Sequence, residues 1–386
     1  MQLLSGASPW EALLFSLVAY GLPLLLGWWL FGSKLNPARP LPAATATPTP
    51  VWIPLLLGLT ALFTLYGGVW DGVQHVETGA VVGGADFLWP PHLLIYTSYL
   101  VAFVVALAGL ARLAGEGARL GVRDPRIWVR RNPYLGAVVL ACLYSLLSVP
   151  GDAIWHEIFV DLHAWTPPHI MLALTSYAVL VSALGLLVGA RATSARPRLL
   201  DLAGMTMLGT AAGVALLVGV LEWELPGPRA VFVAARPIWL YPVVFAVVYF
   251  ITLVVARTTL PRWSATGAAV LGWGVKVATL GVLHLAGHLT TALPLIPVGG
   301  ALLLDAVPWE RIQGAVLRSL AMSAAYAAGF VACTVPLLLN RPDIESFTAR
   351  DIGMTFVVTM VAGVVLLPVA QWAGLRMARA GGRAAA

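Results

Sequence analysis

Charged residues are scarce in this chain. Of its 386 residues, 10% are Asp, Glu, Lys or Arg, whereas 60% are hydrophobic. Soluble domains carry roughly 25% charged residues, so this composition cannot supply a water-exposed surface and excludes a soluble globular protein. We therefore expect one all-α domain over residues 1–386, a polytopic integral membrane bundle whose surface contacts lipid.

Lysine is almost absent. Lys34 and Lys276 are the two examples, and arginine supplies most of the positive side chains behind the formal charge of +6. A basic balance on a soluble protein would favour nucleic-acid binding. Here the arginines lie in short segments between apolar runs, as expected for charge that fixes membrane topology. A nucleic-acid partner is therefore not expected.

Cysteine is equally rare. Cys142 and Cys333 each lie inside an apolar run, and the chain has neither a CxxC metal motif nor a CxxCH haem-attachment motif, so a disulfide framework is not expected. A Walker A motif and a convincing dinucleotide-binding motif are also missing, which disfavours nucleotide-driven transport. Because no basic segment precedes the first apolar run, we expect residues 10–30 to form a retained helix and not a cleaved signal peptide.

Long apolar runs are plentiful, and ten of them are long enough to span a bilayer as helices. They lie near 9–31, 51–74, 91–113, 134–155, 168–190, 199–221, 235–257, 265–287, 314–339 and 352–375. The stretch 289–308 is open between an eleventh span and a re-entrant segment, because Pro294, Pro297, Gly299 and Gly300 interrupt it. The expected fold is therefore a bundle of about 10–11 transmembrane helices.

Loop charges alternate along the chain. The segments 31–50, 112–133, 191–198 and 257–264 carry arginine, while the segments between them carry acidic residues. Arginine-rich loops stay on the cytoplasmic side of a membrane, so we predict a multi-pass protein of the cell membrane with an extracytoplasmic N-terminus. The arginines of the C-terminal tail favour eleven spans, because an odd number places that tail in the cytoplasm.

Two stretches, 70–112 and 151–191, read alike and predict a repeated helical hairpin. The matching pieces are WDGVQHVE and GDAIWHEI, followed by FLWPPHLLIYTSYL and HAWTPPHIMLALTSY. Each copy has an Asp-x3-His motif near the end of one helix and Pro-Pro-His at the start of the next. A third, degenerate copy is expected at 221–257, where tryptophan and proline recur without histidine.

The second copy gathers residues of the types that bind metals. Asp152 and His156 are four residues apart and share one helix face. Thr166 can cap a helix that Pro167 opens, which places His169 in the first turn of that helix. Two imidazoles and one carboxylate from adjacent helix ends suit copper, zinc or Fe(II).

The same reasoning selects Asp71, His75 and His92 in the first copy. The loop between its two histidines is longer, but it contains glycines that allow it to bend. The alternative interpretation is that Asp and His of both copies are solvated at a membrane interface, where tryptophan also forms a belt. If both copies ligate, we expect two clusters on one face of the membrane.

The segment DAIWHEIFVDLHAWTPPHI, residues 152–170, resembles the metal-site segment of a membrane subunit of the copper membrane monooxygenases, the methane and ammonia monooxygenases. The positions that match the family pattern are Asp152, Trp155, His156, Thr166, Pro167, His169 and Ile170. The resemblance implies that Asp152, His156 and His169 are copper ligands near the periplasmic face. It further implies a copper-dependent membrane monooxygenase component.

One further span contains polar residues at membrane depth. His284 and His288 are four residues apart near its end, and Lys276 lies near its middle. A charge at mid-span is costly and usually faces the interior of a bundle or a polar cavity. These side chains could add ligands or relay protons; structural hydrogen bonds for the histidines and a buried ion pair for the lysine are the alternatives.

Acidic residues also lie beside the second motif and at the end of the sixth apolar run. Further candidate ligands or relay residues near the second motif are Glu157, Asp161 and His163. Glu222 and Glu224 flank Trp223 at a helix end, where we expect them to be solvated at the membrane interface.

Three functions are compatible with these patterns. The first is a membrane metalloprotein with a copper site, or alternatively zinc or iron, that activates dioxygen or holds metal for a partner. The second is an ion, proton or metal transporter in which the repeat forms a pathway. The third is an accessory subunit of a membrane redox complex. Membrane lipid and either other membrane subunits or further copies of the chain are the expected partners.

Overall fold

The computed structural model describes residues 9–34, 49–78, 88–119, 121–158, 164–191, 194–225, 236–288, 292–341, 344 and 347–380, without the side chains of residues 12, 146, 156 and 380. Every regular element in these ranges is helical. Ten helices of the described chain are long and apolar enough to cross a membrane. The predicted all-α polytopic helical bundle is therefore confirmed.

The long helices are α1 (Pro9–Gly27, continued by the π-helical turn η1, Trp28–Gly32), α2 (Trp52–Thr78), α3 (Pro90–Arg119), α5 (Pro133–Ile158), α6 (Pro167–Arg191), α7 (Pro197–Glu224), α9 (Leu240–Thr259), α10 (Ser264–Leu285), α12 (Ala315–Leu339) and α13 (Ala349–Ala380). The short ones are α4 (Pro125–Arg131), α11 (Val298–Ala306) and the 3₁₀ turn η2 (Trp309–Arg311). Proline opens α3, α5, α6 and α7, as expected for a residue whose missing N–H is not needed in the first turn.

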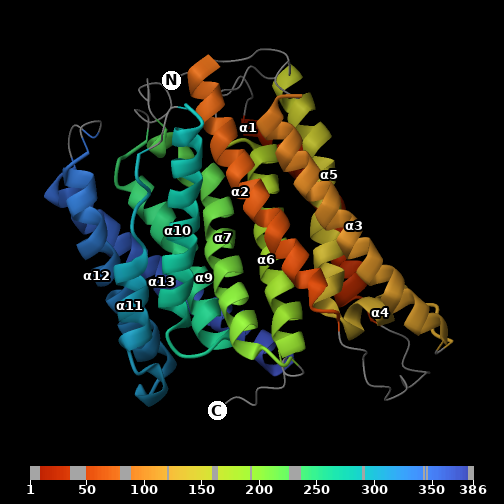
Figure 1. Ribbon diagram of the computed structural model, residues 1–386. Helices are drawn as coiled ribbons and strands as arrows, with labels where there is room; N and C mark the ends of the chain where they lie inside the picture. The colour runs from red at the N-terminus through yellow and green to blue at the C-terminus, as the bar shows by residue number, and fades with distance from the viewer. Residues whose placement is uncertain are drawn as a thin grey trace.

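Successive long helices run in alternate directions (Figure 1). α2, α5 and α7 finish at one end of the bundle, where α3 and α6 begin; we call this the Asp–His end, after the motifs in these helices. α3 and α6 finish at the opposite end, beside α4; we call this the arginine end. The hairpins α2–α3 and α5–α6 thus place both Asp-x3-His motifs at the same end.

Arginine side chains at the arginine end stabilise helix termini. Arg130 donates from Nε to the Leu30 carbonyl at 2.7 Å and from Nη2 to the Ser33 carbonyl at 2.5 Å. Carbonyls at a helix C-terminus have no partner within the helix, so these bonds satisfy groups that lipid could not. Arg191 forms a two-pronged pair with Asp201 at 2.5 and 2.9 Å, which joins α6 to α7.

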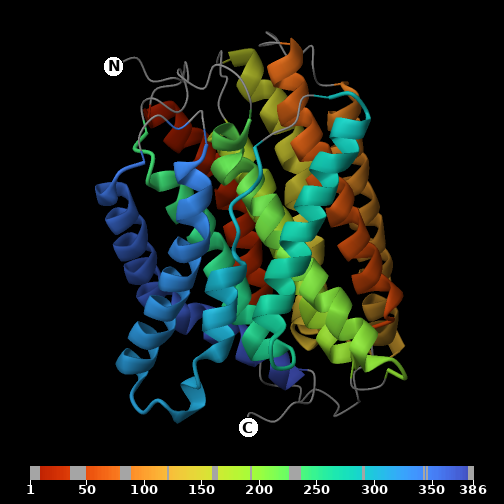
Figure 2. The ribbon, with the colours of Figure 1, turned by 60° about the vertical axis from the view of Figure 1, so that its left-hand side comes forward.

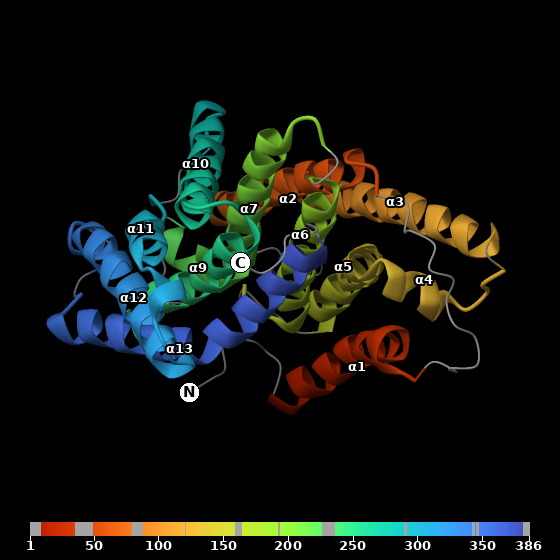
Figure 3. The same cartoon turned by 90° about the horizontal axis from the view of Figure 1, so that it is seen from below.

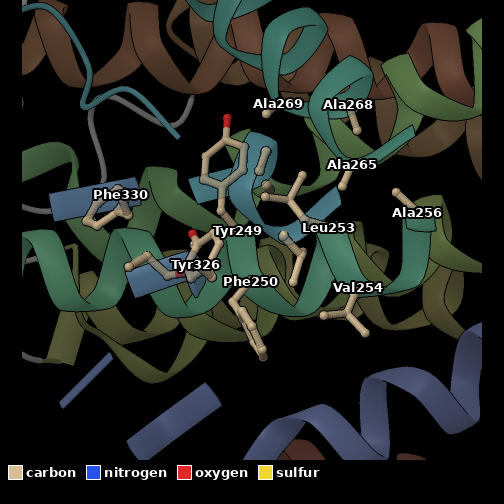
Figure 4. Packing of buried hydrophobic residues seen from close by; sticks show 14 of the residues in the cluster. Tyr249, Phe250, Leu253, Val254, Ala256, Ala265, Ala268, Ala269, Tyr326 and Phe330 are labelled. Atoms are coloured by element: carbon tan, nitrogen blue, oxygen red, sulfur yellow. Dashed lines mark hydrogen bonds between the residues drawn. The ribbon is translucent and has the colours of Figure 1, made fainter. Parts of the chain in front are cut away.

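Aromatic rings from α9 and α12 form the centre of the larger hydrophobic core (Figure 4). The ring centroids of Phe250 and Tyr326 are 5.1 Å apart, and those of Tyr326 and Phe330 are 6.1 Å apart. The Tyr326 hydroxyl donates to the Ala246 carbonyl at 2.8 Å, so this buried ring keeps a partner for its polar atom. Small alanine side chains of α10 face the same core.

Two glycines allow α7 and α10 to touch through their backbones. A Cβ atom added at Gly272 would lie 2.5 Å from Cα of Gly209, whereas one added at Gly274 would meet nothing within 4 Å. We expect Gly272→Ala to destabilise the fold by about 1–3 kcal/mol, because backbone atoms must move apart. Gly274→Ala on the same helix is the control and should be neutral or stabilising. Thermal unfolding in one detergent compares them, and equal melting temperatures would contradict the close approach.

The stretch 289–308, for which an eleventh span was favoured, contains a helix of only 9 residues, α11. At a rise of 1.5 Å per residue this helix is about 14 Å long, too short to cross a bilayer. The expectation of an eleventh continuous transmembrane helix is therefore wrong. Pro294 and Pro297 precede the helix, and residues 292–297 have no regular structure.

The described stretch 292–306 nevertheless runs from one end of the bundle to the other. Its Ala292 N–H donates to the carbonyl of Glu224, the last residue of α7, at 2.7 Å. Near its other end, Asp305 accepts hydrogen bonds from the backbone N–H and hydroxyl of Thr266, at the start of α10, both at 2.8 Å. The chain thus makes a discontinuous crossing, with an extended half at the Asp–His end and a helical half at the arginine end.

This crossing sets where the chain finishes. The end of α13 lies at the arginine end, where the hydroxyl of Thr259 in α9 bonds to the Gly374 carbonyl at 3.3 Å. The start of α1 and the end of α13 lie at opposite ends of the bundle (Figure 2). This agrees with an odd number of crossings. Which end faces the cytoplasm stays a prediction from the loop charges.

Single cysteines can test this orientation. In a background without Cys142 and Cys333, we expect Val122→Cys, at the arginine end, to react only after membrane permeabilisation. Val160→Cys, which follows α5 in the chain, should react from outside in intact cells. Labelling with a membrane-impermeant maleimide distinguishes the two, and the reversed pattern would place the Asp–His end in the cytoplasm.

The first helix, α1, lies at the edge of the bundle beside α5 (Figure 3). Phe15 packs edge-on against Trp155 of α5 at a centroid distance of 5.2 Å. The Tyr20 hydroxyl reaches the carbonyl of Pro167, at the start of α6, at 3.3 Å. α1 therefore covers part of the second hairpin near its Asp-x3-His motif.

Candidate metal centre

The first Asp-x3-His motif and the first turn of α3 converge at the Asp–His end. Asp71 and His75 lie one turn apart on α2, with Nε2 of His75 3.5 Å from Oδ1 of Asp71. His92 lies in the first turn of α3, and its Nε2 is 2.8 Å from the same oxygen. One potential ligand atom from each residue lies within 4.8 Å of the other two.

A glycine allows this convergence. Gly67 lies one turn before Asp71 on the same face of α2, and a Cβ atom there would lie 3.2 Å from the Pro91 carbonyl and 2.8 Å from a side-chain carbon of Ile95. The start of α3 can therefore lie directly against α2. This contact brings His92 within reach of Asp71.

The geometry fits a metal ion. Ligands about 2.0–2.2 Å from one ion lie on the order of 3–3.5 Å from each other, close to the two Asp–His distances. Oδ1 of Asp71 is buried and, despite its 2.8 Å approach to His92, does not make a hydrogen bond of ordinary direction. A buried oxygen facing two imidazole nitrogens without such a bond is the arrangement that a shared cation would satisfy.

Aromatic rings surround these histidines. The Trp89 ring lies 5.2 Å from the His75 ring, and the Tyr96 ring stacks on His92 at 5.8 Å. The side chain of His92 is 12% exposed and that of His75 is 36% exposed. The group is therefore partly shielded and opens to its surroundings on the side of His75.

The second copy has a comparable pair. Nε2 of His169 lies 3.2 Å from Oδ1 of Asp152. As expected from the sequence, Thr166 caps α6, because its hydroxyl accepts the His169 N–H at 3.4 Å and its carbonyl accepts the Ile170 N–H at 2.9 Å. His156 lies in α5, but its side chain is outside the described atoms, as are Asp161 and His163. Two of the three predicted ligands are thus brought together.

The two clusters are neighbours. α2 packs against α6, and α3 packs against α5. Between the hairpins the Tyr99 hydroxyl bonds to the Ser176 hydroxyl at 2.6 Å in a buried contact. His169 of the second cluster is close enough to interact electrostatically with the Asp71 carboxylate of the first. The equivalence of the hairpins as sequence repeats, and the degenerate third copy at 221–257, stay predictions.

Other candidates lie outside the Asp71 group. His288 bonds through Nδ1 to Glu77 at 3.0 Å, which ties the end of α10 to the end of α2. His284 is exposed on α10, and Glu157 is exposed at the end of α5. In the described structure these side chains do not join the three-residue group.

Lys276 takes part in a buried ion pair, one of the alternatives raised by its position. Its Nζ contacts Oε2 of Glu224, and the Tyr241 hydroxyl donates to Oε1 of the same carboxylate at 3.3 Å. The expectation that Glu222 and Glu224 are solvated is wrong, because Glu222 is 9% exposed and Glu224 is fully buried. The sequence signal that could have indicated this burial is Lys276, a charge at mid-span that needs a partner.

Comparison with protein-family models, curated proteins and solved structures gives no match to this chain. The similarity of residues 152–170 to a copper monooxygenase segment therefore rests on those residues alone. What the structure adds is the placement of metal-binding residue types at one end of a membrane bundle.

Proposed function

We propose that this chain is an integral membrane metalloprotein that binds a transition-metal ion through Asp71, His75 and His92. The observation that supports the proposal is the convergence of one carboxylate and two imidazoles from α2 and α3 within 4.8 Å. In the proposed complex the charge of Asp71 offsets that of the cation. Trp89 and Tyr96 hold the two imidazole rings in place and limit access of water to them.

Copper is the metal proposed first, with zinc and iron as the alternatives. An Asp and two His suit all three, and the resemblance of residues 152–170 to the copper monooxygenase segment favours copper. We propose Asp152, His156 and His169 as a second site of the same kind. With copper bound, such a site would supply redox chemistry with dioxygen, so a role in a copper-dependent membrane monooxygenase with partner subunits is the finer hypothesis.

Retained metal tests the proposal. We expect the purified protein, loaded with copper and washed with a weak chelator, to keep one or two ions per chain, measured by inductively coupled plasma mass spectrometry. Zinc and iron loading in parallel would identify the preferred metal. Less than one tenth of an ion of any of the three per chain after washing would overturn the proposal.

Transport is the second candidate function, and a different observation favours it. The discontinuous crossing 292–306 begins beside Glu224, which forms the buried pair with Lys276. Broken helices and intramembrane charges are common at ion-binding sites of secondary transporters. Cation or proton flux in liposomes without retained metal would support this function.

A further inference from the structure

The loop that opens α6 is held by a helix outside both hairpins. Oε1 of Glu222, near the end of α7, accepts the backbone N–H of Ala164 at 2.6 Å. One residue on, the indole N–H of Trp165 donates to the carbonyl of Gly219 at 3.2 Å. Two consecutive residues of the loop are therefore bonded to the last turns of α7.

An arginine completes this attachment. Nη1 of Arg236 lies 2.6 Å from Oε2 of Glu222, so each carboxylate oxygen has a partner. The guanidinium also lies 4.4 Å above the Trp165 ring and 5.5 Å from the Trp223 ring. Charge-assisted hydrogen bonds and cation–π contacts are strong when their groups are shielded from water, as Glu222 and Arg236 are.

The attachment ends where His169 begins. Thr166 follows Trp165 directly, is 1% exposed, and bonds to the backbone N–H groups of His169 and Ile170. The position of Thr166 therefore determines where the first turn of α6 starts. That turn sets the 3.2 Å separation between Nε2 of His169 and Oδ1 of Asp152.

We propose that Glu222 is a positioning residue for the metal site at Asp152 and His169, acting through Ala164–Thr166, with Arg236 as its partner. This inference rests on the proposed function of that site. Glu222 is not a ligand in this scheme, because its two oxygens bond to Ala164 and Arg236. Groups that orient metal ligands from outside the coordination sphere typically change metal affinity by about 10–100-fold.

The second site can be measured alone in a His92→Ala background, which disables the first. There we expect Glu222→Ala to weaken copper binding by about 10–100-fold in a chelator competition. Glu222→Gln keeps an acceptor for Ala164 but loses the charge that binds Arg236, so it should lie between Glu222→Ala and the parent. At saturating copper the stoichiometry should be unchanged, whereas the electron paramagnetic resonance spectrum of Cu(II) should shift.

A second variant tests the partnership. Arg236→Gln should weaken copper binding as Glu222→Gln does, and the double variant should be no worse than the weaker single, because both changes break one interaction. Glu310→Gln, an exposed carboxylate at the arginine end, is the control and should match the parent.

These outcomes separate the hypotheses. A lower melting temperature with unchanged copper affinity and spectrum would show a purely structural role for Glu222 and overturn the inference, as would fully additive losses in the double variant. If the His92→Ala parent binds no copper while the wild type does, the second site itself is refuted. If the wild type binds none, the proposed function fails first.

Discussion

The His92→Ala variant should bind copper at the first site at least about 100-fold more weakly than the parent. His92 supplies one of three potential ligand atoms, and loss of a group that merely orients a ligand already costs about 10–100-fold. The measurement is a chelator competition in detergent, carried out in an Asp152→Ala background so that the second cluster cannot retain the ion. Asp71→Asn should have a similar effect, because it keeps the side-chain shape but removes the charge.

The control for this experiment is a histidine at the same end of the bundle. His284 is exposed on α10 and lies outside the Asp71 group. His284→Ala should therefore leave copper affinity within about twofold of the parent. Equal losses in His284→Ala and His92→Ala would indicate non-specific binding, and unchanged binding in His92→Ala would show that the observed convergence does not hold a metal.

Most of the long helices and the first cluster were predictable from local sequence. Apolar runs mark the ten helices of span length that the described structure contains, because a segment in lipid must satisfy its own backbone hydrogen bonds. Asp71 and His75 share a helix face by their spacing, and Pro90 and Pro91 mark the start of the next helix. Two helices joined by a short connection are adjacent, so His92 had to lie near this pair.

Contacts between distant segments were not predictable in this way. Pro294 and Pro297 indicated an interrupted stretch, but its docking depends on a bond from Ala292 to Glu224 that no local pattern encodes. Glu224 itself was expected to be solvated at a helix end, because its partner Lys276 lies 52 positions further along the chain. Burial of an acidic residue is decided by whether such a partner reaches it.

The His288 and Glu222 assignments differ for the same reason. The spacing of His284 and His288 suggested further ligands, but α10 directs His288 to Glu77 and not to the Asp71 group. Glu222 showed no motif, and its link to the second site depends on Ala164 in a loop from another hairpin. Residues that ligate could be selected by type and spacing, whereas residues that position them required the packing of α7 against α6.

The Lys276→Met variant should be strongly destabilised, by about 3–5 kcal/mol, because it leaves a buried carboxylate without its counter-charge. The side chains of Lys276 and Glu224 are 3% and 0% exposed, and the Tyr241 hydroxyl is the other side chain that bonds to the Glu224 carboxylate in the described structure. Thermal unfolding in one detergent is the measurement. Lys34→Met, which removes an exposed lysine at the arginine end, should unfold at the wild-type temperature.

The double variant Lys276→Met with Glu224→Gln should recover most of that stability, because neither remaining side chain is charged and glutamine can still bond to Tyr241. A single variant as stable as the wild type, or a double variant no better than the single, would contradict a stabilising charge pair. The double variant also distinguishes the two candidate functions. Its fold is retained while its buried charges are gone, so a metalloprotein should keep its copper, whereas a transporter that uses this pair should lose flux.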